Sequence, residues 1–182
     1  PQSSMGAHVS AHSFGLETKF NVASIGAFGY EFDITKSTKS ELAIIKKQVE
    51  FYKKHRMLLQ YGDYYKLGDG VAKSDIGGWM TVAEDKSEAI AVIFDKRNYR
   101  GASRPRHTFK GLDNDALYKV SMRKQSNVGE KMTFEFTAYG DVLNNGELDF
   151  ENLAWYEEDK KDYPRAFASR MFYITKVRSA KK

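Results

Sequence analysis

Residues 131–139 read KMTFEFTAY, and polar and apolar side chains alternate along the whole run. Successive side chains of a β-strand point to opposite faces of a sheet, so this pattern predicts a strand with one buried and one exposed face. Strands of this kind are typical of antiparallel sheets, which often have one face in contact with water. The run therefore favours an antiparallel β fold for the part of the chain around it.

Short runs of similar character follow one another after residue 61. Turn residues separate them, and Glu84-Asp85-Lys86-Ser87 suits the turn of a hairpin. We expect strands at 62–67, 77–84, 88–95, 105–111, 117–123, 131–139 and 168–177. Short strands at this spacing predict an antiparallel β-sandwich domain over residues 61–182. Residues 141–167 are acidic, and we interpret them as irregular.

Residues 1–60 have a more helical pattern. Thr38-Lys39-Ser40-Glu41 has the form of a capping box, in which the threonine and glutamate side chains bond to each other's backbone amides, and it predicts the start of a helix that ends near Gln60. A helix with so broad an apolar face must pack against something larger than itself. The face comprises Leu42, Ile45, Val49, Tyr52 and Leu59, widened by Ile44, Phe51 and Leu58.

Composition narrows the class of protein. The 182 residues are 41% hydrophobic and 29% charged, which is typical of a globular protein and not of a disordered one. The sequence has no cysteine, which excludes disulfides and thiolate sites and favours a reducing compartment, so we expect a cytoplasmic protein. No apolar run is long enough to cross a bilayer, and we expect no membrane association. The first methionine is Met5, and we expect the chain to be a piece of a longer one.

One stretch is strongly basic within a net charge of +5 that is otherwise mixed in sign. Two interpretations stay open for it. It could bind nucleic acid, with cations for phosphates and rings for base stacking, or it could be a solvated loop. We favour the loop and expect no nucleic-acid partner. The stretch comprises Lys96, Arg97, Arg100, Arg104, Arg106, His107 and Lys110, with Tyr99 and Phe109 between them.

The carboxylates and histidines offer few arrangements suited to chemistry. Glu31 and Asp33 would share a face if extended, as a pair of glycosidase carboxylates does, but acids before a helix also simply favour its dipole. His8 and His12 lack further residues that would complete a metal site, so we expect no metal. We expect His55 to be partly buried beside the apolar face of its helix.

Other known site patterns are missing or ambiguous. No Gly-x-Ser-x-Gly nucleophile elbow and no glycine-rich phosphate loop is present. Trp79 and Trp155 could stack on sugars, although Trp79 lies within a predicted strand and is expected in the core. The residues taken alone therefore predict a β-sandwich with a helical N-terminal extension and no complete active site.

Several strings of residues follow one another along nearly the whole chain. They are Ser4-Met5-Gly6-Ala7-His8-Val9-Ser10, Leu16-Glu17-Thr18-Lys19-Phe20-Asn21-Val22-Ala23, Gly29-Tyr30-Glu31-Phe32-Asp33-Ile34-Thr35-Lys36, Phe51-Tyr52-Lys53-Lys54-His55-Arg56, Tyr61-Gly62-Asp63-Tyr64-Tyr65-Lys66-Leu67, Gly111-Leu112-Asp113-Asn114-Asp115-Ala116-Leu117-Tyr118 and Ala168-Ser169-Arg170-Met171-Phe172. Each string is weak alone, but the ordered set resembles the α-galactosidases of glycoside hydrolase family 36.

The resemblance implies a retaining α-galactosidase that acts on α-galactosides of the raffinose or melibiose type, without a metal or organic cofactor. It implies that residues 1–60 are the last strand and helices of a (β/α)8 catalytic barrel, and that residues 61–182 are the C-terminal antiparallel β-sandwich. The family's two catalytic aspartates lie on earlier barrel strands, and no carboxylate here matches them. We therefore assign no catalytic residue and expect the chain alone to be inactive.

The resemblance also implies contacts of the intact enzyme. His8 and Ser10 would face the α-galactoside substrate, because barrel sites gather at the carboxyl ends of the strands. The segment after them, Ala11-His12-Ser13-Phe14-Gly15, is shorter than in the family, which affects the expected specificity. We expect the intact enzyme to be a homo-oligomer. Without the other barrel strands, we expect residues 1–35 to be loosely held, or packed against a neighbouring chain in place of the missing barrel. A non-catalytic carbohydrate-binding module is the alternative function.

Overall fold

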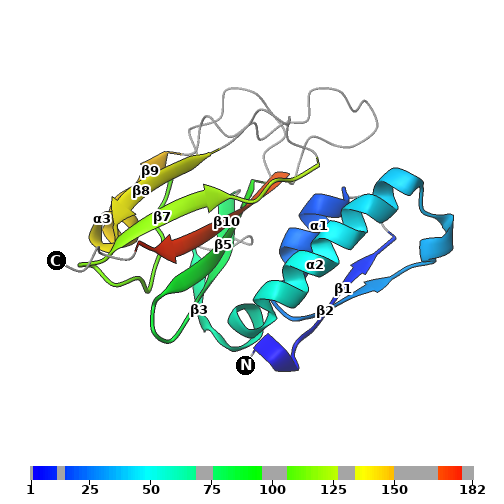
Figure 1. Ribbon diagram of the computed structural model, residues 1–182, viewed down its shortest axis with the longest axis horizontal. Coiled ribbons are helices and arrows are strands. Elements are labelled where there is room, and N and C mark those ends of the chain that lie inside the picture. The colour runs from blue at the N-terminus through cyan, green and yellow to red at the C-terminus, as the bar shows by residue number, and fades with distance from the viewer. Residues whose placement is uncertain are drawn as a thin grey trace.

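The structure, a computed structural model, describes residues 2–11, 15–68, 76–95, 106–126, 134–149 and 168–177. It divides into a smaller N-terminal part and a larger sheet (Figure 1). The N-terminal part comprises η1 (Gln2–Ser4), β1 (Gly6–Ser10), α1 (Leu16–Ala23), β2 (Ala27–Glu31), η2 (Ile34–Lys36) and α2 (Lys39–Tyr61). The remainder comprises β3 (Asp63–Leu67), β4 (Ile76–Val82), β5 (Glu88–Asp95), β6 (Arg106–His107), β7 (Leu117–Met122), β8 (Glu135–Tyr139), α3 (Gly140–Asn145), β9 (Leu148–Asp149) and β10 (Ala168–Lys176).

The main sheet has six strands in the order β3-β4-β5-β10-β7-β8, and every neighbouring pair is antiparallel. β10 comes last in the chain but lies in the middle of the sheet, between β5 and β7. A second, two-stranded sheet pairs β6 with β9. The strand directions and the turn positions agree with the alternating pattern that predicted them, and the antiparallel β-sandwich is confirmed.

The two faces of the sheet carry different cores because neighbouring side chains alternate. In one cross-strand row, Trp79, Val92 and Met171 are paired in register and belong to the core beneath the helices. In the next row, Met80, Ala91 and Phe172 belong to the core on the opposite face. The central strands β4, β5 and β10 are therefore buried on both sides of the sheet.

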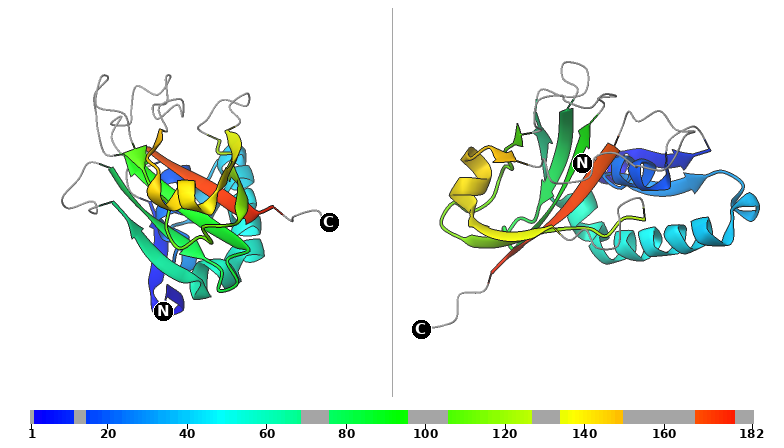
Figure 2. Two further views of the ribbon diagram at one scale, coloured as in Figure 1. Left: turned by 90° about the vertical axis from the view of Figure 1, so that its left-hand side faces the viewer. Right: turned by 90° about the horizontal axis from the view of Figure 1, so that it is seen from above.

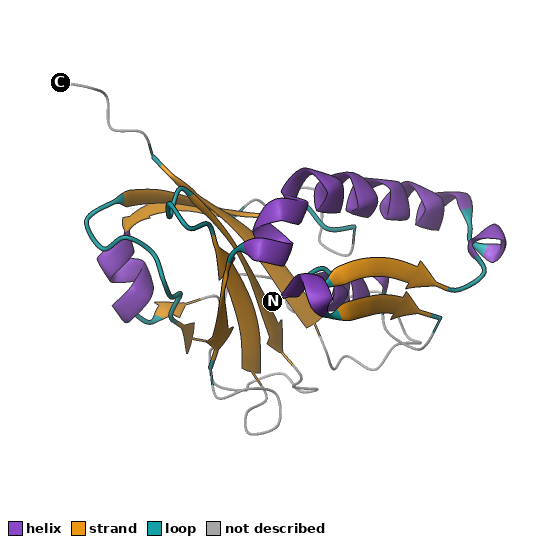
Figure 3. Cartoon of the chain, turned by 90° about the horizontal axis from the view of Figure 1, so that it is seen from below, coloured by secondary structure: helices purple, strands orange, loops and turns teal. Residues whose placement is uncertain are grey.

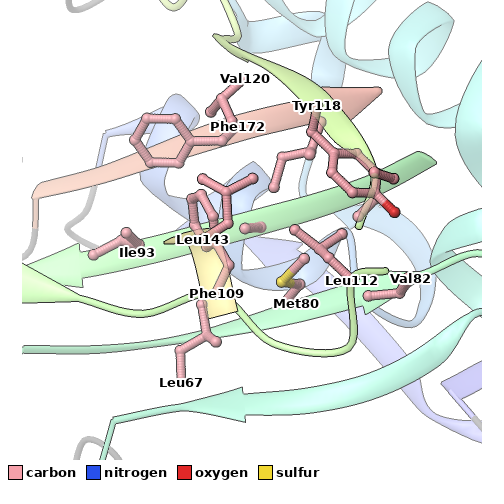
Figure 4. Close-up of a cluster of buried hydrophobic side chains, with 14 residues drawn as sticks. Leu67, Met80, Val82, Ile93, Phe109, Leu112, Tyr118, Val120, Leu143 and Phe172 are labelled. Atoms are coloured by element: carbon pink, nitrogen blue, oxygen red, sulfur yellow. The ribbon is translucent and has the colours of Figure 1, made fainter. Parts of the chain in front are cut away.

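The core on the far side is covered by the segment 107–116 and by α3. Phe109, Leu112, Tyr118 and Leu143 enclose it together with the strand residues (Figure 4). The Tyr118 hydroxyl donates to the Lys86 carbonyl at 2.8 Å and accepts from the Asp113 amide at 3.1 Å, so its polar end is satisfied at the edge of the core. These contacts close the second layer of the sandwich.

The helices α1 and α2 cover the other face of the sheet (Figures 1 and 3). Phe20 of α1 and Leu58 and Leu59 of α2 pack against the sheet row of Trp79, and all three are buried. The capping box of α2 is present as predicted: the Glu41 amide donates to Thr38 Oγ1 at 3.2 Å, and the Thr38 amide donates to Glu41 Oε2 at 2.7 Å. The docked helix that the apolar stripe predicted is thus confirmed.

Some local predictions were wrong. Leu42 is 41% exposed, because the first turns of α2 extend beyond the sheet (Figure 2). The strand expected at 105–111 is only Arg106–His107, since Phe109 turns into the core. The short helix α3 (Gly140–Asn145) lies at the start of a segment that we interpreted as irregular. Its partners are distant in sequence, so the local composition gave no signal for it.

The described residues of the N-terminal part pack through contacts of their own, in contrast to the loosely held arrangement that was one of the two expectations for residues 1–35. β1 pairs in parallel with a second strand, β2, where we expected a single barrel strand. Val9, Phe20 and Ile25 are at most 8% exposed. The Tyr52 hydroxyl donates to the Gly26 carbonyl at 2.7 Å, and so fixes the start of β2 against α2. No described helix is both long and apolar enough to span a membrane.

Candidate functional site

The candidate site lies on the two-stranded parallel sheet of β1 and β2. Its register pairs His8 with Gly29 and Ser10 with Glu31. Side chains therefore divide between two faces: Ala7, Val9, Phe28 and Tyr30 share one, and Gly6, His8, Ser10, Ala27, Gly29 and Glu31 share the other. The first face is directed at α1 and α2, and the second is open.

Aromatic contacts hold the closed face against the helices. Phe28 packs edge-on against Phe20 of α1 with ring centroids 5.3 Å apart, and lies 5.1 Å from the ring of Tyr52 on α2. The Tyr30 hydroxyl donates to Gln48 Oε1 at 2.7 Å. Burial raises the pKa of Tyr30, and the nearby carboxylate of Glu17 raises it further, so this hydroxyl stays a proton donor. These contacts fix which face of the sheet is left open.

On the open face, His8 and Glu31 form a pair. His8 Nδ1 lies 3.2 Å from Glu31 Oε2, and the two side chains are 55% and 70% exposed. A carboxylate so close favours the ring tautomer with its proton on Nδ1. Ser10, at the end of β1, is half-buried, and its carbonyl accepts a hydrogen bond from Lys19 Nζ at 2.9 Å. The structure thus brings the two predicted site residues onto one face and adds Glu31 to them.

Asp33 does not join Glu31 in a carboxylate pair. It caps the short helix η2: Asp33 Oδ1 accepts from the Thr35 amide at 3.1 Å and from the Thr35 hydroxyl at 2.6 Å. These hydrogen bonds lower the pKa of Asp33. The interpretation of Glu31 and Asp33 as a catalytic pair is therefore not supported, and Asp33 has a local capping role at η2.

The other predicted candidates lie mostly in the core or outside the described residues. Trp79 is 4% exposed, so it cannot stack on a sugar. Phe109 is fully buried and cannot stack on a base, and His107 is buried beside it. His55 is 6% exposed, as expected from its place on α2. The candidates outside the described residues are His12, Trp155 and the basic residues 96–105. Within the described residues, no group of three or more His, Cys, Asp or Glu side chains could hold a metal.

A buried polar cluster joins the N-terminal part to the main sheet. Glu17 of α1 and Arg123, which follows β7, form an ion pair with Arg123 Nη2 2.5 Å from Glu17 Oε2. The Ser126 amide donates to Glu17 Oε1 at 2.6 Å, and Gln48 Nε2 of α2 donates to Glu17 Oε2 at 3.0 Å. Burial alone would raise the pKa of Glu17, but the charge of Arg123 and these hydrogen bonds lower it on balance.

The cluster continues toward β10. Asn21 Nδ2 donates to Ser169 Oγ at 2.9 Å and to Gln125 Oε1 at 3.2 Å. Gln125 Nε2 in turn donates to the Ser169 carbonyl at 3.1 Å. Asn21, Gln125 and Ser169 are each at most 5% exposed. Sequence reasoning missed all of these residues, because Glu17 and Arg123 are 106 positions apart and carry no local motif.

Fold and site together define a class of protein domain: an antiparallel β-sandwich that holds a parallel β–α–β unit against one face. Two family models match successive parts of the chain. The model for melibiase covers residues 1–62, and the model described as glycosyl hydrolase family 36 C-terminal domain covers residues 77–174. The chain therefore belongs to glycosyl hydrolase family 36.

Characterised relatives agree with this membership. The α-galactosidase AgaA of Geobacillus stearothermophilus is 41% identical over 127 residues, which are 66% of this chain and 17% of that protein. The α-galactosidase Mel36A of Lactobacillus acidophilus is 36% identical over 126 residues, 65% of this chain and 17% of that protein. The matched part of the chain therefore corresponds to less than a fifth of the length of these relatives.

Solved structures show the same fold. The α-galactosidase from Lactobacillus brevis superimposes with a TM-score of 0.81 and 31% identity, covering 100% of this chain and 24% of that one. AgaA from Geobacillus stearothermophilus superimposes with a TM-score of 0.77 and 32% identity over 97% of this chain and 22% of that one. Variants of AgaA have been solved in complex with stachyose and with raffinose.

Proposed function

We propose that this chain is part of an α-galactosidase that removes terminal galactose from α-galactosides of the raffinose or melibiose type. The observation that carries the proposal is that two family models of these enzymes match its two structural parts in order. Support also comes from AgaA, whose solved complexes contain sugars of the raffinose type. The reaction would retain the anomeric configuration.

The proposal divides the chain near the end of α2. Residues 1–60 would be the edge of a (β/α)8 catalytic barrel, and residues 61–182 the C-terminal β-sandwich. The parallel pairing of β1 and β2, which α1 connects, supports a barrel origin, because parallel strands joined by a helix are the repeating unit of such barrels. Under this proposal β1 and β2 are neighbouring barrel strands.

His8 and Ser10 would face the sugar. They lie in the second half of β1 on its open face, and active sites of barrel enzymes gather at the carboxyl ends of the strands. Their role would be to position the substrate. Retaining hydrolysis needs two carboxyl groups about 5 Å apart, one as nucleophile and one as acid and base, and no metal or organic cofactor. We propose that both of these carboxyl groups lie outside the present chain, which serves as scaffold.

We propose a cytoplasmic location for the intact enzyme, supported by the absence of cysteine from the sequence. We also propose that the intact enzyme is a homo-oligomer. Its partner molecule would be the α-galactoside.

The substrate proposal is tested by comparing anomers. The longer protein that contains this chain is assayed with 4-nitrophenyl α-galactoside and with its β-anomer under the same conditions. We expect release of nitrophenol from the α-anomer only, and release of galactose from raffinose. Cleavage of the β-anomer, or of an α-glucoside in place of the α-galactoside, would show that the proposed substrate class is wrong.

A carbohydrate-binding module is the second candidate. The observation in its favour is a set of exposed aromatic side chains, Tyr61 at 62%, Tyr64 at 50% and Tyr139 at 57%. Such rings can stack on sugars. Calorimetric titration of the 182-residue chain with galactose and with raffinose separates the two: stoichiometric binding favours the module, and the scaffold proposal predicts no detectable heat.

A further inference from the structure

The pair of His8 and Glu31 is not explained by the stability of the fold. The two side chains are 55% and 70% exposed, and exposed ion pairs typically contribute about 0–1 kcal/mol. They also lie on the face of β1 and β2 that contacts neither α1 nor α2. The pair, held at 3.2 Å on an otherwise open face, is therefore placed where a molecule outside this chain's own core can contact it.

Glycines leave the pair accessible. Gly29 is the register partner of His8, and a Cβ at Gly29 would lie 3.9 Å from His8 Cδ2. A Cβ at Gly6 would lie 3.8 Å from His8 Nε2. Each would make ordinary van der Waals contact with the imidazole, and any longer side chain would cover it. The two glycines therefore keep the His8 ring open to a ligand, and the Glu31 carboxylate beside it is itself 70% exposed.

The backbone beneath the pair is held firmly. Glu31 follows Tyr30, whose hydroxyl donates to Gln48 Oε1 at 2.7 Å on the closed face. The Phe28 amide donates to the Tyr52 hydroxyl at 3.2 Å. At the end of β1, Lys19 Nζ donates to the Ser10 carbonyl at 2.9 Å. Rigid support of this kind is what a binding group needs if little entropy is to be lost when a ligand binds.

We propose that Glu31 is a sugar-binding residue of the proposed α-galactosidase, and that His8 orients its carboxylate. His8 lies beside Oε2 of Glu31 and leaves Oε1 to accept from a substrate hydroxyl. Hydroxyl groups are the donors that a sugar offers, and a carboxylate accepts them more strongly than a neutral group does. Glu31 is the last residue of β2, at the same end of the sheet as Ser10. This inference rests on the proposed function.

The test uses three variants of the longer protein that contains this chain: Glu31→Gln, His8→Ala, and Asp33→Asn as the matched control. Asp33 is an exposed carboxylate two residues from Glu31 that caps η2, so its change removes the same charge from the same strand end. We expect Glu31→Gln to raise KM for an α-galactoside about tenfold, or about 1.4 kcal/mol, and to change kcat less than threefold. We expect His8→Ala to give a smaller rise, and Asp33→Asn to stay within twofold.

A second measurement separates contact with substrate from a merely structural role. KM is measured with each of the monodeoxy derivatives of the galactoside, for the wild type and for Glu31→Gln. If Glu31 binds one hydroxyl, the substitution has no further effect on the derivative that lacks it. If the wild type cleaves α-galactosides but Glu31→Gln behaves like Asp33→Asn, or raises KM equally for every derivative, the inference is wrong and the proposed function stands. If the wild type cleaves no α-galactoside, the proposed function itself fails.

Discussion

Glu17 and Arg123 form a buried ion pair between the first helix and the main sheet, with Arg123 Nη2 2.5 Å from Glu17 Oε2 and side chains only 6% and 9% exposed. The Arg123 guanidinium also lies over the ring of Phe20, 4.9 Å from its centroid. Glu17 is on the segment between β1 and β2, and Arg123 follows β7. The pair therefore ties the strands of the candidate site to the β-sandwich, and Gln48 and Tyr30 extend the connection to β2.

We expect removal of one side chain of the Glu17–Arg123 pair to destabilise the fold. We expect Glu17→Gln to lower the free energy of unfolding by about 3–5 kcal/mol, because it leaves the Arg123 charge buried without its partner. Urea denaturation of the 182-residue chain measures this. Glu135→Gln is the control: Glu135 pairs with Lys119 at 2.9 Å on the surface, and its loss should cost at most about 1 kcal/mol. Equal effects of the two substitutions would contradict the role given to the buried pair.

The ionisation of Glu17 in this pair should make the stability of the fold depend on pH under acidic conditions. The pKa of Glu17 is lowered in the folded protein from an ordinary value of 4.5, so the unfolded chain binds the proton more readily. Its contribution to stability is complete above pH 4.5 and is lost as the pH falls through the folded-state pKa. Urea denaturation between pH 6 and 3 should show a smaller loss of stability for Glu17→Gln than for the wild type. If the stability of the wild type and of Glu17→Gln falls equally with pH, the contribution assigned to Glu17 is wrong.

His55 should act in a separate pH range. Its ring lies between Phe51 and Tyr173, with centroids 4.5 Å and 4.8 Å away. Burial lowers the pKa of His55 from 6.5, and the charge of Lys54 lowers it further against the opposing effect of Glu88. The unfolded state therefore takes up the proton first, and stability falls as the pH drops below 6.5.

A phenylalanine at this position keeps the ring contacts and removes the titration. The variant His55→Phe should lose less stability than the wild type between pH 8 and pH 5, as measured by urea denaturation at each pH. That range lies above the one in which Glu17 titrates, so the two effects can be told apart. An unchanged pH dependence would mean that His55 titrates alike in both states.

Close approach of two strands makes Gly78 a sensitive position. A Cβ at Gly78 would lie 2.2 Å from the Val92 carbonyl oxygen. This oxygen belongs to the backbone of β5, so it can move aside only if the strand itself shifts. We expect Gly78→Ala to destabilise the chain by at least about 2 kcal/mol, as overpacking in a core does. Gly15→Ala is the control, because a Cβ at Gly15 meets nothing within 4 Å. Thermal unfolding of both variants measures the difference in their stability. A similar Tm for Gly78→Ala and Gly15→Ala would refute the prediction.

The fold was predictable wherever one local pattern determines it. The capping box at Thr38 and the alternation through Phe134 and Phe136 gave α2 and β8, since both depend on neighbours within a few residues. The place of β10 in the middle of the sheet, and the helix α3, depend on contacts with distant segments. The residues near them therefore carried no sign of either.

The site was only partly predictable. His8 and Ser10 came from a resemblance to a family, and alternation along β1 then puts them on one face. Glu31 was considered with Asp33, its neighbour in sequence, whereas its structural partner is His8, 23 positions away. The partner depends on the parallel pairing of β1 with β2, which brings together residues that are distant in sequence.

The most direct test compares the 182-residue chain with the longer protein that is proposed to contain it, at equal molar concentration, on 4-nitrophenyl α-galactoside. We propose that this chain supports the site and that carboxylates elsewhere cleave the glycosidic bond. We therefore expect rapid release of nitrophenol by the longer protein and a rate equal to that of buffer for the chain alone. Turnover by the purified chain well above buffer would contradict this proposal, because it would require an active site within these residues.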